Sequence, residues 1–345
     1  MSMPSIGIDI SDTSIKYVQF ELPYKRSPEK IFTVYGDLDI PEGTFNRGQV
    51  VDEDKTSEVL HEIKNLTGVQ YARVSLPEER AYIFETHIKK YATRKEIEAN
   101  LEFRLQEHVP LSPRDAYFDY KIVGETKKGY WVVVVVYARE IIMGYYNALQ
   151  KAGIIPISFE VEAQAIARAA VPAGDTNAYM VVDFGKTRTG VGIVYKDTLF
   201  YTSTIDIGGA DISKRLRKHL GDVPEKELTT IKNTEGLIPK VDDTVTYEVL
   251  LSAVSEIKDE IAARLHYWHS LDHSQEMKQI QSIILCGGSA NMRGLPEYFS
   301  ETLGVKTGRV DVWQNVLDQP FVPEIHRRFS YGYATAIGLA LKTGM

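Results

Sequence analysis

The sequence has almost no cysteine, because Cys286 is the single one among 345 residues. One thiol cannot form a disulfide within the chain, so a disulfide-stapled scaffold is excluded and a reducing compartment is favoured. Long apolar runs are missing too. The longest, Tyr130 to Tyr137, is far shorter than the ~20 residues that span a bilayer, and no signal peptide precedes the first strand pattern. We therefore expect a cytoplasmic protein without direct membrane insertion.

An excess of positive charge is also missing. The chain has 40 Lys and Arg against 47 Asp and Glu, a net charge of -7, and its pI is about 5.7. This balance disfavours a nucleic-acid binder, so the basic cluster Lys214 to His219 is interpreted as a solvated helix face. The hydrophobic fraction of 43% and the charged fraction of 25% are typical of a globular protein with one to three domains.

What the sequence does contain is a strand–turn–strand pattern from Tyr179 to Gly190. An apolar run ends on Asp183, Gly185 follows, and hydroxyls at Thr187 and Thr189 precede a second apolar run. Backbone N–H groups, hydroxyls and a cation in such a turn suit phosphate, and Asp183 suits a metal or its water ligands. For this stretch alone, an ordinary hairpin is the alternative.

A second copy of the pattern lies near the start of the chain, from Ser5 to Phe20. Its strand carries Asp9, a polar turn follows from Ser11 to Ser14, and Lys16 on the returning strand can meet a phosphate as a point charge. Two such hairpins in two halves of the chain predict two related domains facing each other across a cleft. A nucleoside triphosphate with Mg²⁺ would be clamped between the turns, each Asp holding metal-bound water.

The remaining periodicity predicts an α/β chain. Thr93 and Glu96 form a capping box for a helix from 93 to 109. The strand–helix–strand–strand order over residues 80–153 is a compact unit in its own right, whereas residues 221–247 are polar and irregular. Further strands are expected at 31–37, 69–77, 81–88, 116–123, 130–138, 154–160, 198–204 and 280–285, and helices at 52–66, 140–151, 162–170, 249–271, 295–303 and 331–341.

Three further motifs complete the pattern. Glu162 begins a helix, where the helix dipole favours an acid, and this place is compatible with a role near bound water. Gly208 and Gly209 precede the free N–H groups of another helix, a natural neighbour of phosphate. Gly287 and Gly288 directly follow a strand, and such a turn lets flat groups approach the backbone closely.

Together, these motifs resemble the signatures of the actin-like ATPase superfamily, which includes actin, sugar kinases, heat-shock chaperones and FtsA. In the order phosphate-1, connect-1, phosphate-2, adenosine and connect-2, the signatures resemble Gly7–Lys16, Phe159–Arg168, Val181–Gly190, Leu285–Gly294 and Tyr331–Leu341. They reach from one end of the chain to the other. Five weak motifs in the right order are a strong signal.

The unit at residues 80–153 indicates which members of the superfamily the chain resembles. Its order is that of the SHS2 subdomain, called 1C, of FtsA and of the type IV pilus assembly protein PilM family. The chain has no room between Phe32 and Tyr71 for the subdomain that actin carries there. It shows no FtsA-type amphipathic tail after Met345, and the stretch Glu260 to Trp268 is similar to a helix of PilM subdomain 2B. The chain therefore resembles the PilM family.

This resemblance implies an α/β actin-like ATPase fold, with two RNase H-like domains around a nucleotide cleft, an inserted SHS2 subdomain 1C and no actin-type 1B. It also implies bound ATP and Mg²⁺. The implied division is subdomain 1A at 1–79 and 154–177 with 330–345 packing back, 1C at 80–153, 2A at 178–215 and 280–329, and 2B at 216–279.

The same resemblance implies roles for individual residues. Glu162 and Asp183 would be catalytic, and Asp9 and Asp183 would hold Mg²⁺ through water. Phosphate contacts would come from Asp9, Ser11, Thr13, Ser14, Lys16, Gly185, Lys186, Thr187, Thr189, Gly208 and Gly209. Adenosine contacts would come from Glu260, Gly287, Gly288, Ser289 and Met292.

Two positions depart from the family pattern. Phosphate-1 turns usually carry Gly two residues after the Asp, where this chain has Ser11. Asp12 then adds an anion beside the phosphates, which weakens binding unless Mg²⁺ or Lys16 compensates. Connect-1 has Ala163 where Pro often follows the Glu. We therefore expect ATP binding with at most slow hydrolysis.

The function implied is that of a cytoplasmic scaffold in type IV pilus or related secretion machinery, peripheral to the inner membrane and forming a homo-oligomer or ring. It would bind the cytoplasmic N-terminal peptide of a PilN-like membrane protein in a groove between 1A and 1C, bordered by the 1C strands and the helix 93–109. ATP would tune this groove by closing the cleft, which requires different affinities for two states. An FtsA-like division filament and a sugar or acetate kinase are the alternatives, although the region 21–70 offers little room for an acceptor pocket.

Overall fold

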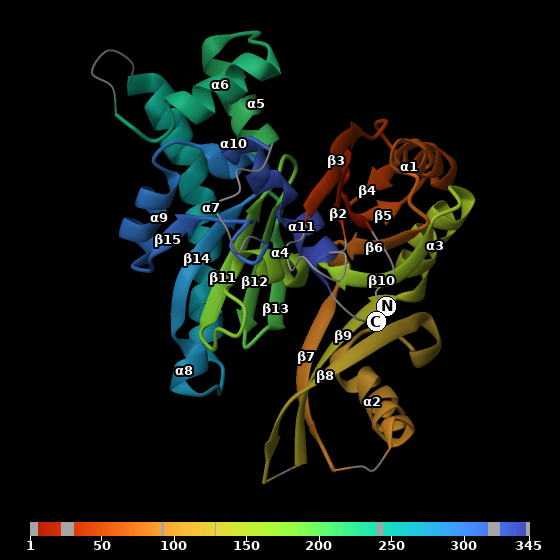
Figure 1. Cartoon of the computed structure of the whole chain (residues 1–345). Helices are drawn as coiled ribbons and strands as arrows, with labels where there is room; N and C mark the ends of the chain where they lie inside the picture. The colour runs from red at the N-terminus through yellow and green to blue at the C-terminus, as the bar shows by residue number, and fades with distance from the viewer. Residues whose placement is uncertain are drawn as a thin grey trace.

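Two five-stranded mixed sheets of the same topology form the two halves of the molecule (Figure 1). The computed structural model describes residues 6–21, 31–90, 93–127, 129–239, 244–316 and 325–342. The first sheet has the order β10-β6-β1-β2-β3, with β1 (Ile6–Ile10), β2 (Ser14–Glu21), β3 (Ile31–Asp39), β6 (Tyr71–Leu76) and β10 (Ile155–Val161). The second has the order β13-β12-β11-β14-β15, with β11 (Ala178–Phe184), β12 (Thr189–Tyr195), β13 (Thr198–Ile205), β14 (Ile280–Cys286) and β15 (Thr307–Arg309).

Each large sheet begins with three antiparallel strands and continues with two parallel ones. In the first sheet β1 pairs antiparallel with β2 and parallel with β6. In the second sheet β11 pairs antiparallel with β12 and parallel with β14. The two Asp-bearing hairpins found in the sequence are therefore β1–β2 and β11–β12, and they occupy equivalent places in the two sheets.

A third, three-stranded antiparallel sheet extends away from these two, at the bottom of Figure 1. Its order is β7-β9-β8, with β7 (Tyr82–Ile88), β8 (Ala116–Thr126) and β9 (Gly129–Ala138). Helix α2 (Arg94–His108) starts at the capping box of Thr93 and Glu96 that the sequence predicts. It buries Ile97, Leu101 and Leu105 against alternate valines of β9. The order along the chain is strand, helix, strand, strand, as predicted.

Helices cover the large sheets, and short elements connect them. The first half contains β4 (Phe45–Asn46), β5 (Gln49–Val50), α1 (Glu53–Thr67), η1 (Glu78–Arg80), η2 (Pro113–Asp115), α3 (Arg139–Lys151) and α4 (Glu162–Ala170). The second half contains α5 (Gly209–Leu220), α6 (Glu225–Thr234), α7 (Thr244–Ser270), α8 (Gln275–Lys278), η3 (Gly288–Asn291), α9 (Leu295–Leu303), α10 (Arg327–Ser330) and η4 (Tyr331–Tyr333). Helix α11 (Ala334–Leu341) returns to the first half and packs on β1 and α4.

The small residues of α11 allow backbone-to-backbone packing. A Cβ atom on Gly338 would lie 1.8 Å from the carbonyl oxygen of Ala165 in α4. A Cβ atom on Gly7 in β1 would lie 2.2 Å from the carbonyl oxygen of Ala336. Neither position can carry a side chain, so these two glycines fix α11 against the strand that bears Asp9.

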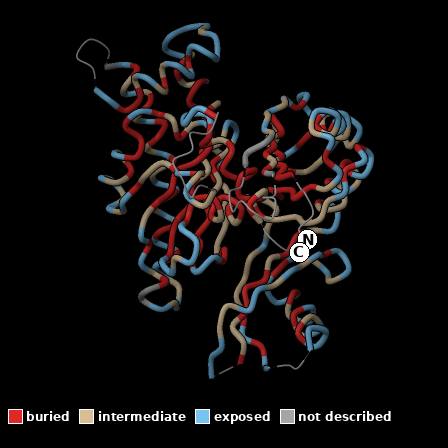
Figure 2. Tube along the Cα trace, in the orientation of Figure 1, coloured by how far each residue is buried: buried red, intermediate tan, exposed pale blue. Residues whose placement is uncertain are grey.

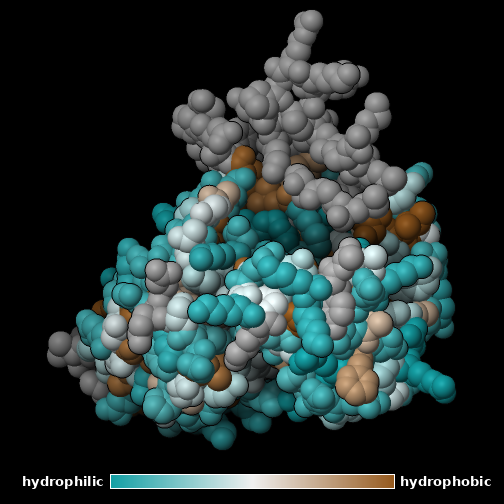
Figure 3. Space-filling model, turned by 90° about the horizontal axis from the view of Figure 1, so that it is seen from below, coloured by the Kyte–Doolittle hydropathy of each residue, from teal (hydrophilic) through white to brown (hydrophobic). Residues whose placement is uncertain are grey.

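Buried residues follow the strands of both large sheets and the helix faces that cover them (Figure 2). Seen from below in Figure 3, the described surface is mainly hydrophilic, and its hydrophobic residues form separate patches. Within the described ranges, no helix is long and apolar enough to cross a membrane.

Two of the differences from the sequence expectations lie in the second half of the chain. Residues 221–247 contain α6, where the sequence indicates irregular structure, and only 240–243 of this stretch lie outside the described residues. Helix α6 is mostly polar and buries Leu228 and Lys232, so its sequence lacks a readable apolar stripe. Strand β15 is also absent from the prediction, because its three residues, Thr-Gly-Arg, carry no apolar run.

Candidate functional site

Four carboxyl side chains from separate elements meet in one small cavity between the two halves. Asp9 and Asp183 are the next-to-last residues of β1 and β11, Glu78 starts η1 and Glu162 starts α4. The cavity has a volume of about 100 Å³. The equivalent positions of β1 and β11 in their sheets bring the two predicted Asp residues to the same place.

Short contacts hold the two Asp residues at the strand ends. Asp9 Oδ1 accepts a hydrogen bond of 2.9 Å from Ser75 Oγ, and Lys16 faces Asp9 across the β1–β2 ladder. Asp183 lies against Gly287, where a Cβ atom would be 2.3 Å from Asp183 Oδ1. Gly287 also has a φ of +81°, so both its conformation and its surroundings require glycine.

The shared, buried environment makes these carboxyl groups hard to ionise. Burial, followed by repulsion from Asp183, raises the pKa of Glu78 to about 8. Burial, followed by repulsion from Asp9, raises the pKa of Asp183 to about 6. The pKa of Glu162 is raised well above its usual value by burial and by the other three carboxylates. Burial also raises the pKa of Asp9, although Lys16 opposes this shift. A cation in the cavity would relieve this cost.

The donor set fits a hydrated divalent cation better than a directly ligated one. In the described part of the chain, no three His, Cys, Asp or Glu side chains are arranged as metal ligands. The oxygen Glu78 Oε2 is buried and has no hydrogen-bond partner. Mg²⁺ keeps several of its waters in proteins and is held by one or two carboxylates. Asp9 and Asp183 are suited to hold such waters, and Glu78 provides a further acceptor.

Arg188, in the turn between β11 and β12, closes the cavity. Its guanidinium contacts the carboxylates of Asp12 in the β1–β2 turn and Glu79 in η1. Asp12 Oδ1 also accepts a 2.9 Å hydrogen bond from the N–H of Gly48. The extra anion that the sequence places in the phosphate-1 turn is therefore already paired with a cation of the other half.

A second contact joins the halves at the mouth of the cleft. Arg47, between β4 and β5, pairs with Asp206 at 2.6 Å, and both side chains are largely exposed. An exposed pair of this kind stabilises little by itself. The side chains that contact Arg188 are far less exposed. The cavity beside them is much smaller than the roughly 300–1,000 Å³ of ligand pockets. Arg188 lines this cavity, so a ligand that enters it would meet the guanidinium.

The predicted phosphate residues divide into those that line the cavity and those behind it. The cavity lining includes Ser11, Thr13, Gly185, Lys186 and Thr187, together with Asp9, Glu162 and Asp183. The residues outside this lining are Ser14, Lys16, Thr189, Gly208 and Gly209.

The residues outside the lining have identifiable partners. Lys16 Nζ lies 2.8 Å from Ser14 Oγ. Thr189 is buried and donates its hydroxyl hydrogen to the carbonyl of Ile207. The N–H of Gly208 bonds Asp211 and the N–H of Gly209 bonds the carbonyl of Gly185. Gly208 and Gly209 thus pack under the β11–β12 turn, and their N–H groups are already used.

The adenosine motif lies beside the same turn. Ser289 in η3 donates a 3.1 Å hydrogen bond to the carbonyl of Gly185, Gly288 has open space where a Cβ would be, and Met292 is buried. Glu260 is not brought to this group. Its carboxylate pairs with Arg264 next to β13, whereas Gly287 follows β14, and β11 and β12 lie between these strands.

A cavity of about 380 Å³ adjoins η3 and was not expected from the sequence. It is lined by Asn233, Thr234, Asn291, Arg293, Arg309, Arg328 and Tyr331. Arg309 donates 2.7 Å hydrogen bonds to the carbonyls of Ala290 and Met292, which fixes η3 from behind. No motif in the sequence unites these residues, because they come from α6, η3, β15, α10 and η4.

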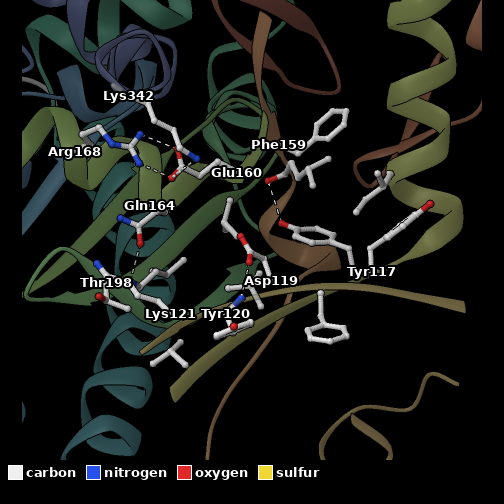
Figure 4. Close-up of a pocket in the computed structure, with 18 of the residues that line it drawn as sticks. Tyr117, Asp119, Tyr120, Lys121, Phe159, Glu160, Gln164, Arg168, Thr198 and Lys342 are labelled. Carbon is white, nitrogen blue, oxygen red and sulfur yellow. Dashed lines mark hydrogen bonds and ion pairs between the residues drawn. The ribbon is translucent and has the colours of Figure 1, made fainter. Parts of the chain in front are cut away.

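A larger cavity, of about 410 Å³, lies where the three-stranded sheet meets both halves (Figure 4). Its floor is apolar and includes Leu76, Val133, Val135, Phe159 and Leu199. Its walls come from β8, β9, β10, α4 and the β12–β13 turn. It is therefore a groove shared by the first half, the three-stranded sheet and the second half.

A polar cluster borders one end of this groove (Figure 4). Glu160 bonds Arg168 and lies 3.6 Å from Lys342. Gln164 accepts a 2.8 Å hydrogen bond from the N–H of Leu199. The carbonyl oxygen of Asp197 accepts hydrogen bonds from Gln164 and Lys121. These bonds attach the β12–β13 turn to the groove.

The expectation that the helix 93–109 borders the groove is wrong for this cavity. Helix α2 packs against the β9 face that carries Val132, Val134 and Val136. The cavity is lined by the alternate residues Val133 and Val135, which point to the opposite face because successive side chains of a strand alternate. Strands β8 and β9 of the three-stranded sheet line this cavity.

Comparison with known proteins gives the same fold and a family. A family model described as "Type IV pilus assembly protein PilM" matches residues 7–344. Among solved structures, a PilM-PilN type IV pilus biogenesis complex has a TM-score of 0.80 at 19% identity, covering 99% of this chain and 98% of that chain.

More distant solved structures share the fold. MreB 5 of Spiroplasma citri bound to AMPPNP has a TM-score of 0.57 at 13% identity, covering 98% and 95% of the two chains. Ethanolamine utilization protein EutJ from Carboxydothermus hydrogenoformans has a TM-score of 0.53 at 17% identity, covering 99% and 92%. The chain thus has an α/β actin-like ATPase fold with two mixed sheets, and it belongs to the type IV pilus assembly protein PilM family.

Proposed function

We propose that this protein is an ATP-binding scaffold of type IV pilus machinery. It binds Mg²⁺ and ATP between its two halves and the cytoplasmic N-terminal peptide of a PilN-like membrane protein in the 410 Å³ groove. It is cytoplasmic and peripheral to the inner membrane through that partner. The observation that carries the proposal is the groove itself, an apolar slot next to the nucleotide-binding halves in a chain of the PilM family.

The nucleotide half of the proposal is supported by the four carboxyl groups. Asp9 and Asp183 would hold the waters of Mg²⁺, which neutralises phosphate charge, and Lys186, Thr187 and the β1–β2 turn would face the phosphates. MreB 5 of Spiroplasma citri, which has the same fold, is solved bound to ADP and bound to AMPPNP. Glu162 and Asp183 line the same cavity, where they are placed to hold a water beside the phosphates.

The adenine base of ATP is proposed to lie at the 380 Å³ cavity beside η3. Gly288 leaves room for a flat group, and Asn291, Arg328 and Tyr331 line that cavity. Glu260 is not part of this proposal, because it pairs with Arg264 on the β13 side.

The partner half is supported by the shape of the groove and by the solved PilM-PilN complex of the same fold. In the proposed division, the three-stranded sheet with α2 is subdomain 1C, β10 and α4 belong to 1A, and the β12–β13 turn belongs to 2A. A ring or other homo-oligomer of the scaffold remains part of the proposal.

Calorimetry on nucleotide-free protein tests both parts of the proposal, ATP binding and peptide binding. We expect ATP binding that depends on Mg²⁺, and binding of a synthetic peptide with the cytoplasmic N-terminal sequence of the PilN-like partner. Phe159→Asp, which places a charge in the apolar floor, should abolish peptide binding and leave ATP binding intact. Peptide binding that is unaffected by this change would remove the groove from the proposal, and robust phosphotransfer to a sugar or acetate would replace the scaffold with a kinase.

A further inference from the structure

Strand β8 is an edge strand, and its outer edge opens into the groove. The sheet order β7-β9-β8 gives β8 no second strand partner among the described residues. Five consecutive residues of β8, 117–121, line the groove, whereas β9 contributes the alternate residues Val133, Val135 and Tyr137. Successive side chains of a strand point to opposite faces, so a cavity over one face is lined by every second residue. A cavity at the edge of the strand is lined by consecutive residues. The groove is therefore bounded by the backbone edge of β8.

One hydrogen bond shows which backbone groups of β8 point outward. The N–H of Tyr120 donates to Asp119 Oδ1 at 2.9 Å, so it points away from β9. In an antiparallel ladder, the N–H and C=O of one residue share a side, and this side alternates along the strand. The ladder with β9 is regular from Ala116 to Ile122. Phe118, Tyr120 and Ile122 therefore present their backbone groups at the outer edge.

The opposite wall of the groove is also a strand edge. Strand β10 pairs only with β6 in the described sheet, and its consecutive residues 159–161 line the groove. The apolar lining on the β10 side includes Phe159 and Val161, whereas Val133 and Val135 belong to β9, on the inner side of β8. A slot with an open strand edge and an apolar lining matches an extended chain, whose backbone can bond the edge while alternate side chains contact that lining.

We propose that the partner peptide binds as an extended strand added to the outer edge of β8. The inference rests on the proposed function, which names the partner, and it states the chemistry that the groove selects: backbone pairing with apolar side chains at alternate positions. Phe118, Tyr120 and Ile122 exchange backbone hydrogen bonds with the peptide. In the free protein the N–H of Tyr120 donates its hydrogen bond to Asp119. In the complex the same N–H donates to a peptide carbonyl instead. Charged side chains commonly block free edge strands, and Asp119 has that place here.

The first test uses the synthetic N-terminal peptide of the PilN-like partner with a single N-methyl group at each backbone amide in turn. Methylation removes one donor and leaves every side chain unchanged. We expect affinity, measured by calorimetry, to fall about tenfold or more at every second position and to stay unchanged between them, because only alternate amides face β8. A uniform effect along the peptide overturns strand addition.

The second test compares Tyr120→Pro with Tyr120→Ala. Both variants lack the phenol ring of Tyr120, but only proline lacks the outward N–H, and neither loses a bond to β9. We expect the proline variant to bind the peptide about tenfold more weakly than the alanine variant. Equal affinities contradict the proposal.

A third readout needs no variant and distinguishes a failure of strand addition from a failure of the proposed function. In the wild-type protein, peptide binding should slow hydrogen exchange at the amides of Phe118, Tyr120 and Ile122. Peptide binding without this protection overturns strand addition and leaves the groove assignment intact. No binding of the unmodified peptide overturns the proposed function, and the strand addition with it.

Discussion

Arg188 and Asp197 lie just outside the two ends of β12, and both contact the opposite half of the molecule. The Arg188 side chain contacts two carboxylates of the first half at the phosphate turn. The carbonyl oxygen of Asp197 accepts hydrogen bonds from Lys121 and Gln164 at the groove. Strand β12 is paired on both sides, with β11 and β13. It therefore connects the cavity of the four carboxyl groups to the groove as a stiff element.

Asp183→Asn should remove most of the affinity for ATP with Mg²⁺. The change keeps the size of the side chain but removes the charge that holds metal-bound water, so we expect a loss of roughly tenfold to hundredfold. The melting temperature should not fall, because a buried carboxyl whose pKa is raised to about 6 costs stability when it ionises. Calorimetry with and without Mg²⁺ measures the first effect. Unchanged affinity would show that the phosphate-2 assignment is wrong.

Asp12→Asn should strengthen ATP binding. The amide can still accept the hydrogen bond from Gly48, but the substitution removes an anion and frees Arg188 to meet the phosphates. We expect a gain of roughly threefold to tenfold in affinity. Asp222→Asn, at an exposed position between α5 and α6, is the matched control for the loss of one charge. Equal effects of the two changes would mean that Asp12 acts only through net charge.

Glu78→Gln should change how stability depends on pH. The folded protein holds the Glu78 proton up to a pKa of about 8, whereas the unfolded chain releases it near 4.5. The stability that this proton contributes is fully present below the lower value and is lost as the pH rises through the higher one. The glutamine variant should therefore melt at a higher temperature than the wild type at pH 8, and the gap should shrink at pH 5. A difference in melting temperature between variant and wild type that is the same at pH 5 and pH 8 would contradict the raised pKa of Glu78.

How much of the site the sequence reveals depends on how local its signals are. Asp9 and Asp183 are readable because each ends an apolar strand before a polar turn, and the capping box at Thr93 is a local motif as well. Glu78 has no such signal. It becomes a cavity residue only because η1 packs on the second sheet, where a Cβ atom on Gly190 would be 2.3 Å from Glu78 Oε2.

Tertiary packing also explains the other departures. Arg188 lies inside a motif that the sequence shows, but its partners come from two elements of the other half. Glu260 lies on the long helix that the sequence predicts, yet the register of α7 turns its carboxylate toward Arg264 and β13. Periodicity predicts that a helix exists and which face is buried. It does not predict which polar side chain reaches a neighbouring element.

We expect the β12 connection to make ATP and peptide affinities interdependent. Gln164 holds the β12–β13 turn through two hydrogen bonds, 2.8 Å from the N–H of Leu199 and 3.3 Å to the carbonyl of Asp197. If ATP displaces Arg188 from its carboxylates, we expect β12 to shift and to strain these bonds. The groove would then differ between the two states, and only such a difference can couple the ligands.

Gln164→Ala should therefore reduce the coupling, measured as the ratio of peptide dissociation constants with and without ATP and Mg²⁺. A direct effect of Gln164 on the peptide cancels in this ratio. Asp197→Gly is the matched control, because it keeps the carbonyl oxygen and because glycine readily adopts the φ of +56° found there. We expect a ratio that differs from one by at least about threefold in the wild type and the control, and a ratio near one in Gln164→Ala. A wild-type ratio of one would show that β12 transmits nothing, whereas an unchanged ratio in Gln164→Ala would place the coupling elsewhere.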